Sequence, residues 1–248
     1  MKKPVALTQS DPVWEITRVF NTPLVVCKNL SAMPVCQCVA VTYFYRHLDN
    51  HYPELKRHKL AWSFGCMAAV LGSEWCHNLT HTMFAEWINK PIDAIRLNYG
   101  MPLLVYFDPD DPEVTPREHM FRAIGGPLFN ALTLLPLHFL RRGTTQDSPN
   151  HFLAQLAFGT NLFLLAAALS PHPSLDGGPL LKWSLIDAGK SRHEAENFVK
   201  RANGVAACAY SVLSVFFLSH GKKLAAALLG LLGISSLAVA LGWLDEAY

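Results

Sequence analysis

The chain has 248 residues, of which 51% are apolar and 16% charged, and its formal net charge is +2. A soluble domain of this length is normally more charged and less apolar, so the composition favours a membrane protein with several spans. No stretch rich in lysine and arginine with interleaved aromatic residues occurs, which argues against nucleic acid as a partner.

Six apolar stretches are predicted to cross the bilayer as helices. The clearest is 224–243, about twenty uncharged residues, which is the length that a membrane-spanning helix needs. The other five contain polar residues and cover approximately 32–45, 60–87, 119–140, 152–170 and 203–219. We therefore expect an all-α polytopic membrane protein with about six transmembrane helices, forming a single membrane domain over residues 1–248.

Lysine and arginine are more numerous in the segments that six spans with a cytoplasmic N-terminus would place inside. This excess predicts cytoplasmic N- and C-termini.

Two segments outside the spans, 16–28 and 97–107, are rich in β-branched and other apolar residues typical of strands. Pro23 and Pro102 suggest that both are edge strands. Extended backbone is tolerated at membrane depth only where protein or water surrounds it, so we expect short strands at the membrane interface.

The segment His77-Asn-Leu-Thr-His81 lies inside the 60–87 span and places two imidazoles one helical turn apart, where both can bind one zinc ion. At about 100° per residue, Glu74, His77, Asn78 and His81 fall within about a third of the helix circumference. An ionisable group at membrane depth costs about 2.5 kcal/mol or more, so several on one face predict a functional site.

Catalytic zinc needs a third protein ligand, and Asp176 is the best candidate. It follows an apolar span within 170–178, where prolines and glycines can turn a carboxylate back into the bundle. Two alternatives stay open: Asp176 could cap the next helix, and His172 could be a further ligand.

Three motifs in this order resemble the site-2 protease family of intramembrane zinc metalloproteases. They are His77-Asn-Leu-Thr-His81, Gly125-Gly-Pro-Leu-Phe-Asn130, and Asn161 followed by Pro171-His-Pro-Ser-Leu-Asp-Gly-Gly178. The resemblance covers about 16–187 and leaves two additional transmembrane helices within 203–243.

The resemblance implies that His77, His81 and Asp176 are zinc ligands on the cytoplasmic half of the bilayer. It implies that Asn130, in a helix broken by Pro127, holds the substrate backbone. An edge strand at 103–106 could pair with an unwound transmembrane or juxtamembrane peptide segment, or could be only an interfacial lid.

The chain departs from the family at Asn78, where the family has the glutamate that serves as the catalytic acid and base. An amide cannot carry a proton, and losing a positioned acid–base group costs about 10²–10⁴ in rate. Glu74, one turn earlier, could replace this base, contact the metal or an imidazole, or pair elsewhere in the bundle.

Two main interpretations follow, both in a bacterial or archaeal cell membrane. The first is a metalloprotease-like zinc protein that hydrolyses transmembrane peptide bonds, with Asn78 and Glu74 as its catalytic pair. The second is an inactive pseudoprotease that binds membrane helices as an adaptor or assembly factor. A transporter has less support, because no paired broken helices or inverted repeats occur.

Overall fold

The computed structural model describes residues 13–108 and 110–244. The chain divides into two compact units. Unit 1 contains the chain up to Asp111 together with Gly125–Ala166, and unit 2 contains Pro112–Ile124 and the chain from Ala167 onward. Each unit is described separately below.

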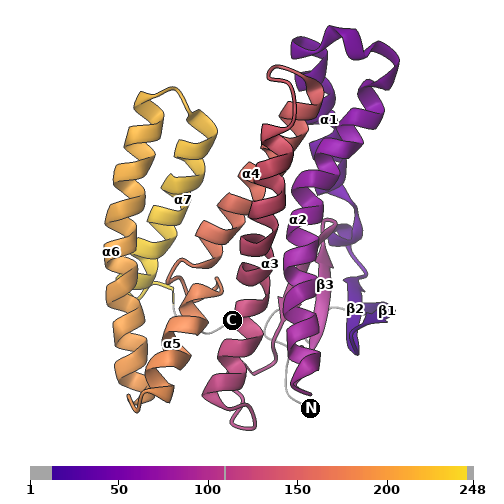
Figure 1. Cartoon of the computed structure of the whole chain (residues 1–248). Helices are drawn as coiled ribbons and strands as arrows, with labels where there is room; N and C mark the ends of the chain where they lie inside the picture. Colours follow the sequence, from indigo (N-terminus) through magenta and orange to yellow (C-terminus); the bar gives the residue numbers. More distant parts are fainter. Residues whose placement is uncertain (1–12, 109, 245–248) are drawn as a thin grey trace. The chain divides into compact units, whose positions relative to one another are not determined.

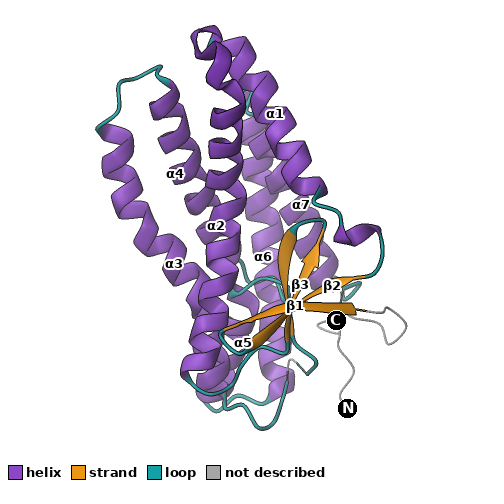
Figure 2. Ribbon diagram, turned by 90° about the vertical axis from the view of Figure 1, so that its right-hand side faces the viewer, coloured by secondary structure: helices purple, strands orange, loops and turns teal. Residues whose placement is uncertain are grey.

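Unit 1 contains a four-stranded sheet, which Figure 2 shows as a twisted group of orange strands. Its strands are β1 (Val13–Val19), β2 (Thr22–Cys27), β3 (Ala94–Asn98) and β4 (Met101–Val105), in the order β1-β2-β3-β4. The outer pairs are antiparallel and β2 runs parallel to β3.

Each segment predicted as one strand is a hairpin. Phe20 and Asn21 have positive φ between β1 and β2, and Tyr99 and Gly100 have positive φ between β3 and β4. Two consecutive residues with positive φ match the twist of the flanking strands and close a tight hairpin. The prediction of strand character is confirmed, but the turn within each segment is not predicted from the sequence.

The two prolines differ in position. Pro102 lies on β4, at the edge of the sheet, as predicted. Pro23 lies on β2, which has a strand on each side, so its predicted edge position is wrong. Pairing of β2 with β3 begins only at Leu24, so Pro23 stands just outside that ladder and its missing N–H interrupts no bond there.

Unit 1 contains the helices α1 (Val35–His51) and α2 (Lys59–Trp87), together with most of α4 (Pro149–Ala168) and the larger part of a further helix. A buried cluster of Phe44, Leu48 and Cys66 joins α1 to α2, and Phe152 of α4 packs against it. This apolar contact packs α1 and α4 against α2, the helix that carries both histidines.

Helix α3 (Pro116–Arg142) contributes its first residues to unit 2 and the rest, from Gly125, to unit 1. It continues through Pro127 and Pro136, so the predicted break at Pro127 is wrong. Prolines are tolerated inside membrane helices because neighbouring groups satisfy the released backbone carbonyls.

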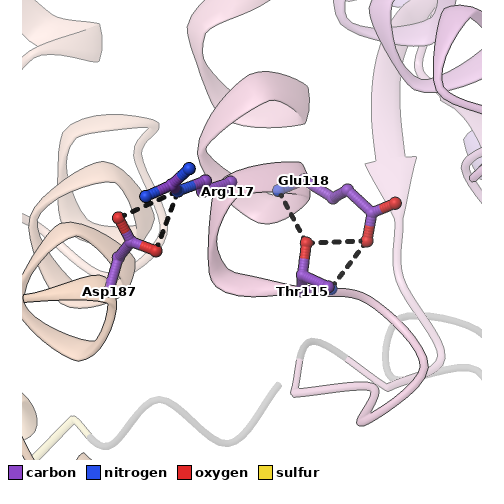
Figure 3. Close-up of polar contacts among 4 residues, drawn as sticks. All are labelled: Thr115, Arg117, Glu118 and Asp187. Atoms are coloured by element: carbon purple, nitrogen blue, oxygen red, sulfur yellow. Dashed lines mark hydrogen bonds and ion pairs between the residues drawn. The ribbon is translucent and has the colours of Figure 1, made fainter. Parts of the chain in front are cut away.

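The start of α3 is capped within unit 2. The Thr115 hydroxyl lies 3.4 Å from the Glu118 backbone nitrogen, and the Glu118 carboxylate accepts from the Thr115 backbone N–H at 2.7 Å, a capping box with Pro116 at the first helical position (Figure 3). Arg117 donates to the Asp187 carboxylate at 3.1 Å. This ion pair ties α3 to the end of α5 (Gly177–Asp187).

Unit 2 ends in a hairpin of two long helices, α6 (Arg192–Ser219) and α7 (Lys223–Ala240), drawn in orange and yellow in Figure 1. Small residues face each other across the two helices, with Gly233 close to Ser211. The Ser214 hydroxyl donates to the Ala226 carbonyl at 2.7 Å. Large apolar side chains such as Val205, Val212 and Ile234 lie exposed on the outer faces. Such faces suit contact with lipid.

Among the described residues, four helices are long and apolar enough to cross a membrane: α3, α4, α6 and α7. These helices make the chain an integral membrane protein. The two other predicted spans are also helical, as α1 and α2, but they are not among the four. Glu74, His77, Asn78 and His81 lower the hydropathy of α2 where it carries the predicted site.

Candidate metal centre

His77 and His81 lie on the buried face of α2, 8% and 2% exposed. Because they are four residues apart on a helix, their rings meet, edge to face, with centroids 4.8 Å apart. Their Nε2 atoms lie 3.2 Å apart. The predicted convergence of two imidazoles on one face is confirmed.

This spacing fits a shared metal ion. Two nitrogens bound to one tetrahedral zinc at about 2.0–2.1 Å lie about 3.3 Å from each other. Two ring nitrogens at such a distance also need a proton or a cation between their lone pairs, since like lone pairs repel. The donor pair is therefore suited to zinc in both atom type and geometry.

The glycine pair Gly125 and Gly126 of α3 lets this helix approach α2 closely at the histidines. A Cβ on Gly125 would lie 2.9 Å from the Thr80 carbonyl oxygen. A Cβ on Gly126 would lie 2.5 Å from His77 Nε2 and would collide with His81 Nε2. Glycine thus keeps open the space at the Nε2 atoms of both histidines.

Asn130, predicted to hold substrate, is fully buried and contacts His77. Its Oδ1 lies 2.5 Å from His77 Nδ1 and its Nδ2 donates to Asn161 Oδ1 at 2.9 Å. Both polar atoms of the amide are thus engaged by side chains of unit 1.

Glu74 and Asn78, the predicted catalytic pair, contact each other. Asn78 Nδ2 donates to the Glu74 carboxylate at 3.0 Å and to the Glu74 backbone carbonyl at 2.9 Å. Asn78 is buried and Glu74 half-buried. The Glu74 carboxylate is therefore held against the side chain that directly follows His77 in the sequence.

Asp176, the predicted third ligand, lies in unit 2 at the N-terminus of α5. Its carboxylate makes no capping hydrogen bond to that helix, so the alternative that it serves as a cap is wrong. Gly177 and Gly178 pack closely on the preceding loop: a Cβ on Gly178 would lie 2.7 Å from the His172 carbonyl carbon. The two glycines allow the tight bend that carries Asp176.

A side chain of α6 holds the same loop. Asn203 is fully buried and its Nδ2 donates to the Pro171 carbonyl at 2.7 Å. The helix that was expected to be an addition to the core therefore supports the loop that bears Asp176.

His172, the further candidate ligand, is buried in this loop. Its Nδ1 accepts from the Ser174 backbone N–H at 3.1 Å. A neutral imidazole that accepts at Nδ1 carries its proton on Nε2, and then neither nitrogen offers a lone pair to a metal. The hydrogen bond therefore disfavours His172 as a ligand.

Ser73 and Asn203 are not among the predicted site residues, and Asn161 is predicted only as part of a motif, without a role. The structure places Asn161 against Asn130, Ser73 against Asn161, and Asn203 against the loop of Asp176. The available signal was a polar side chain inside an apolar span, which is costly unless it is paired. Asn203 is an isolated example, whereas Asn161 belongs to the third motif and Ser73 directly precedes Glu74.

No family model matches the sequence, and no curated protein matches it. Among solved structures, the chain is similar to the site-2 protease from Methanocaldococcus jannaschii, with a TM-score of 0.48 and 14% identity, over 93% of this chain and 94% of that chain.

Proposed function

We propose that this chain is a membrane-embedded zinc protein of the intramembrane metalloprotease type, which hydrolyses peptide bonds in transmembrane or juxtamembrane segments. The observation that carries the proposal is the buried convergence of His77 Nε2 and His81 Nε2, 3.2 Å apart. A pair of buried imidazoles at this spacing, with glycine clearing the space beside it, has zinc binding as its simplest purpose.

Asp176 is the proposed third ligand. Two imidazoles and one carboxylate form a donor set that could hold a metal ion. Three protein ligands and one open position are typical of catalytic zinc. When bound, zinc would supply a Lewis acid that polarises a peptide carbonyl and activates water.

Glu74 is the proposed proton carrier. Asn78 cannot take a proton, but its Nδ2 holds the Glu74 carboxylate at 3.0 Å. A carboxylate fixed in this way can accept a proton from attacking water and return it to the leaving amine, as general acid–base catalysis requires. Asn78 then acts as the residue that orients Glu74.

The proposed membrane arrangement has six spans, with α1 and α2 added to the four most apolar helices and the N-terminus in the cytoplasm of a bacterial or archaeal cell.

The outer edge of β4 has no strand partner among the described residues, because β4 pairs only with β3. An extended peptide could add to this edge and thus be presented as a substrate.

Cleavage of an unstructured membrane peptide by the purified full-length protein tests this proposal. We expect zinc-dependent cleavage that falls about 10²–10⁴-fold in Glu74→Gln, because a positioned acid–base group is lost. Glu86→Gln, on the same helix, is the matched control and should cleave normally. Cleavage that survives Glu74→Gln would remove Glu74 from the mechanism.

A second function has one observation in its favour. The Asn78 amide stands at the catalytic position and donates to Glu74, so the chain could be a pseudoprotease that keeps the metal and binds membrane helices as an adaptor or assembly factor. The Asn78→Glu variant separates the two. If the unaltered protein does not cleave and the Asn78→Glu variant cleaves strongly, the protein is a pseudoprotease whose other site residues are still able to support catalysis.

A further inference from the structure

A chain of polar side chains leads from His77 through three helices of unit 1. Beyond the contacts of Asn130 with His77 and Asn161, Asn161 Nδ2 donates at 2.9 Å both to the Ser73 hydroxyl and to the Ala157 backbone carbonyl. The side chains belong to α2, α3 and α4, and both asparagines are almost completely buried.

The direction of each hydrogen bond in this row of side chains follows from the contact farthest from His77, which is the bond to the Ala157 carbonyl. The Ala157 carbonyl can only accept, so the atom of Asn161 that faces it must be the NH₂ group. Asn161 Oδ1 therefore faces Asn130, which must donate through Nδ2. The oxygen of Asn130 is then left to face His77 Nδ1, which must carry a hydrogen.

The tautomer of His77 is thereby fixed. A neutral imidazole with its proton on Nδ1 has its lone pair on Nε2, the atom that lies 3.2 Å from His81 Nε2. A polar partner on the second nitrogen of a metal-binding histidine fixes the orientation and basicity of the ring.

We propose that Asn130 is a positioning residue, which together with Asn161 locks His77 in the tautomer that presents Nε2 to the metal. This inference rests on the proposed zinc site and deepens it. Because both polar atoms of Asn130 are engaged inside the protein, we assign it this role in place of a contact with the substrate backbone.

His172 provides an internal contrast for a test. Its Nδ1 accepts a backbone N–H, so its proton belongs on Nε2, the opposite of His77. The same protein should therefore show two buried histidines in opposite tautomers.

The experiment is nitrogen NMR of histidine-labelled, zinc-free, full-length protein in detergent micelles at alkaline pH, with signals assigned through His77→Gln and His172→Gln. We expect His77 protonated on Nδ1 and His172 on Nε2. In Asn130→Leu, His77 should become a mixture of tautomers while His172 does not change. Zinc affinity, measured by competition with a chelator, should fall about 10–100-fold in this variant.

Two further variants test the direction of the chain. Asn130→Asp keeps an acceptor for His77 Nδ1 but loses the donor to Asn161 Oδ1, so it should keep His77 protonated on Nδ1 and recover only part of the affinity that Asn130→Leu loses. Ser73→Ala should change neither tautomer nor affinity, because the Ala157 carbonyl still orients Asn161.

Two results would overturn the inference: His77 protonated on Nε2 in the unaltered protein, or unchanged tautomer and affinity in Asn130→Leu. The first result decides even if Asn130→Leu does not fold. Failure of the proposed function would look different. An unaltered protein that has no zinc affinity, but in which His77 is protonated on Nδ1, would rule out the metal site. The hydrogen bonds from His77 to Asn161 would still be as described.

Discussion

The region around His77 and the loop around Asp176 hold their proposed ligands by different means. Side-chain amides from neighbouring helices support His77 on a long regular helix. Asp176 stands on a tight bend, where two glycines approach backbone carbonyls and Asn203 binds one carbonyl of the loop. Ring orientation matters for an imidazole, whereas for the carboxylate it is the path of the backbone that has to be fixed.

The strongest challenge to the His77 region is Gly126→Ala. The added Cβ would collide with His81 Nε2 and crowd His77 Nε2, so we expect loss of stoichiometric zinc and a destabilisation of about 1–3 kcal/mol from overpacking. Metal analysis and thermal unfolding in detergent measure both effects. Gly72→Ala is the control, since a Cβ there meets nothing within 4 Å.

The corresponding challenge to the Asp176 loop is Gly178→Ala. A Cβ at Gly178 would lie 2.7 Å from the His172 carbonyl carbon, so the bend must open. We expect lower zinc affinity with the tautomer of His77 unchanged, which chelator competition and NMR would show. A changed His77 tautomer would contradict the separate support of the two regions. Gly204→Ala on α6 should be silent, because its Cβ meets only Ala240 at 3.7 Å.

Asn203→Leu tests the support that α6 gives to the loop. It leaves the Pro171 carbonyl without its donor, which should cost about 1–3 kcal/mol in unfolding free energy and weaken zinc binding less than Gly178→Ala does. Asn197→Leu, an exposed position on the same helix, should change stability by no more than about 0.5 kcal/mol. Equal effects of the two variants would remove Asn203 as a support.

The smallest effect is expected for Arg117→Ala. The ion pair with Asp187 joins α3 to α5, but its guanidinium side chain is 81% exposed. Exposed ion pairs contribute about 0–1 kcal/mol, so unfolding free energy and zinc affinity should stay near those of the unaltered protein. A large loss of zinc affinity in Arg117→Ala would show that the exposed ion pair with Asp187 also helps to hold the Asp176 loop.

Much of this arrangement is predictable from local patterns. The four-residue spacing of His77 and His81 predicts a shared helix face, and apolar length predicts the membrane helices, because both signals depend on neighbours along the chain. The capping box at Thr115 and Glu118 is a signal of the same kind.

Other features depend on partners distant in sequence. Asn161 and Ser73 meet across 88 residues, and no local pattern predicts that these two side chains are partners. The hairpin turns were missed because Phe20 and Tyr99 adopt positive φ, which residue type alone does not favour. Two of the boundaries between the units fall inside the helices α3 and α4, where no change of composition marks them.

Zinc content of the purified full-length protein tests the central claim most directly, with His77→Ala, Asp176→Ala and the control Asp187→Ala measured in parallel. The account predicts stoichiometric zinc in the unaltered protein and in Asp187→Ala, and its loss in the other two variants. Zinc retained with undiminished affinity in Asp176→Ala, or absent from the unaltered protein, would contradict a site built from His77, His81 and Asp176.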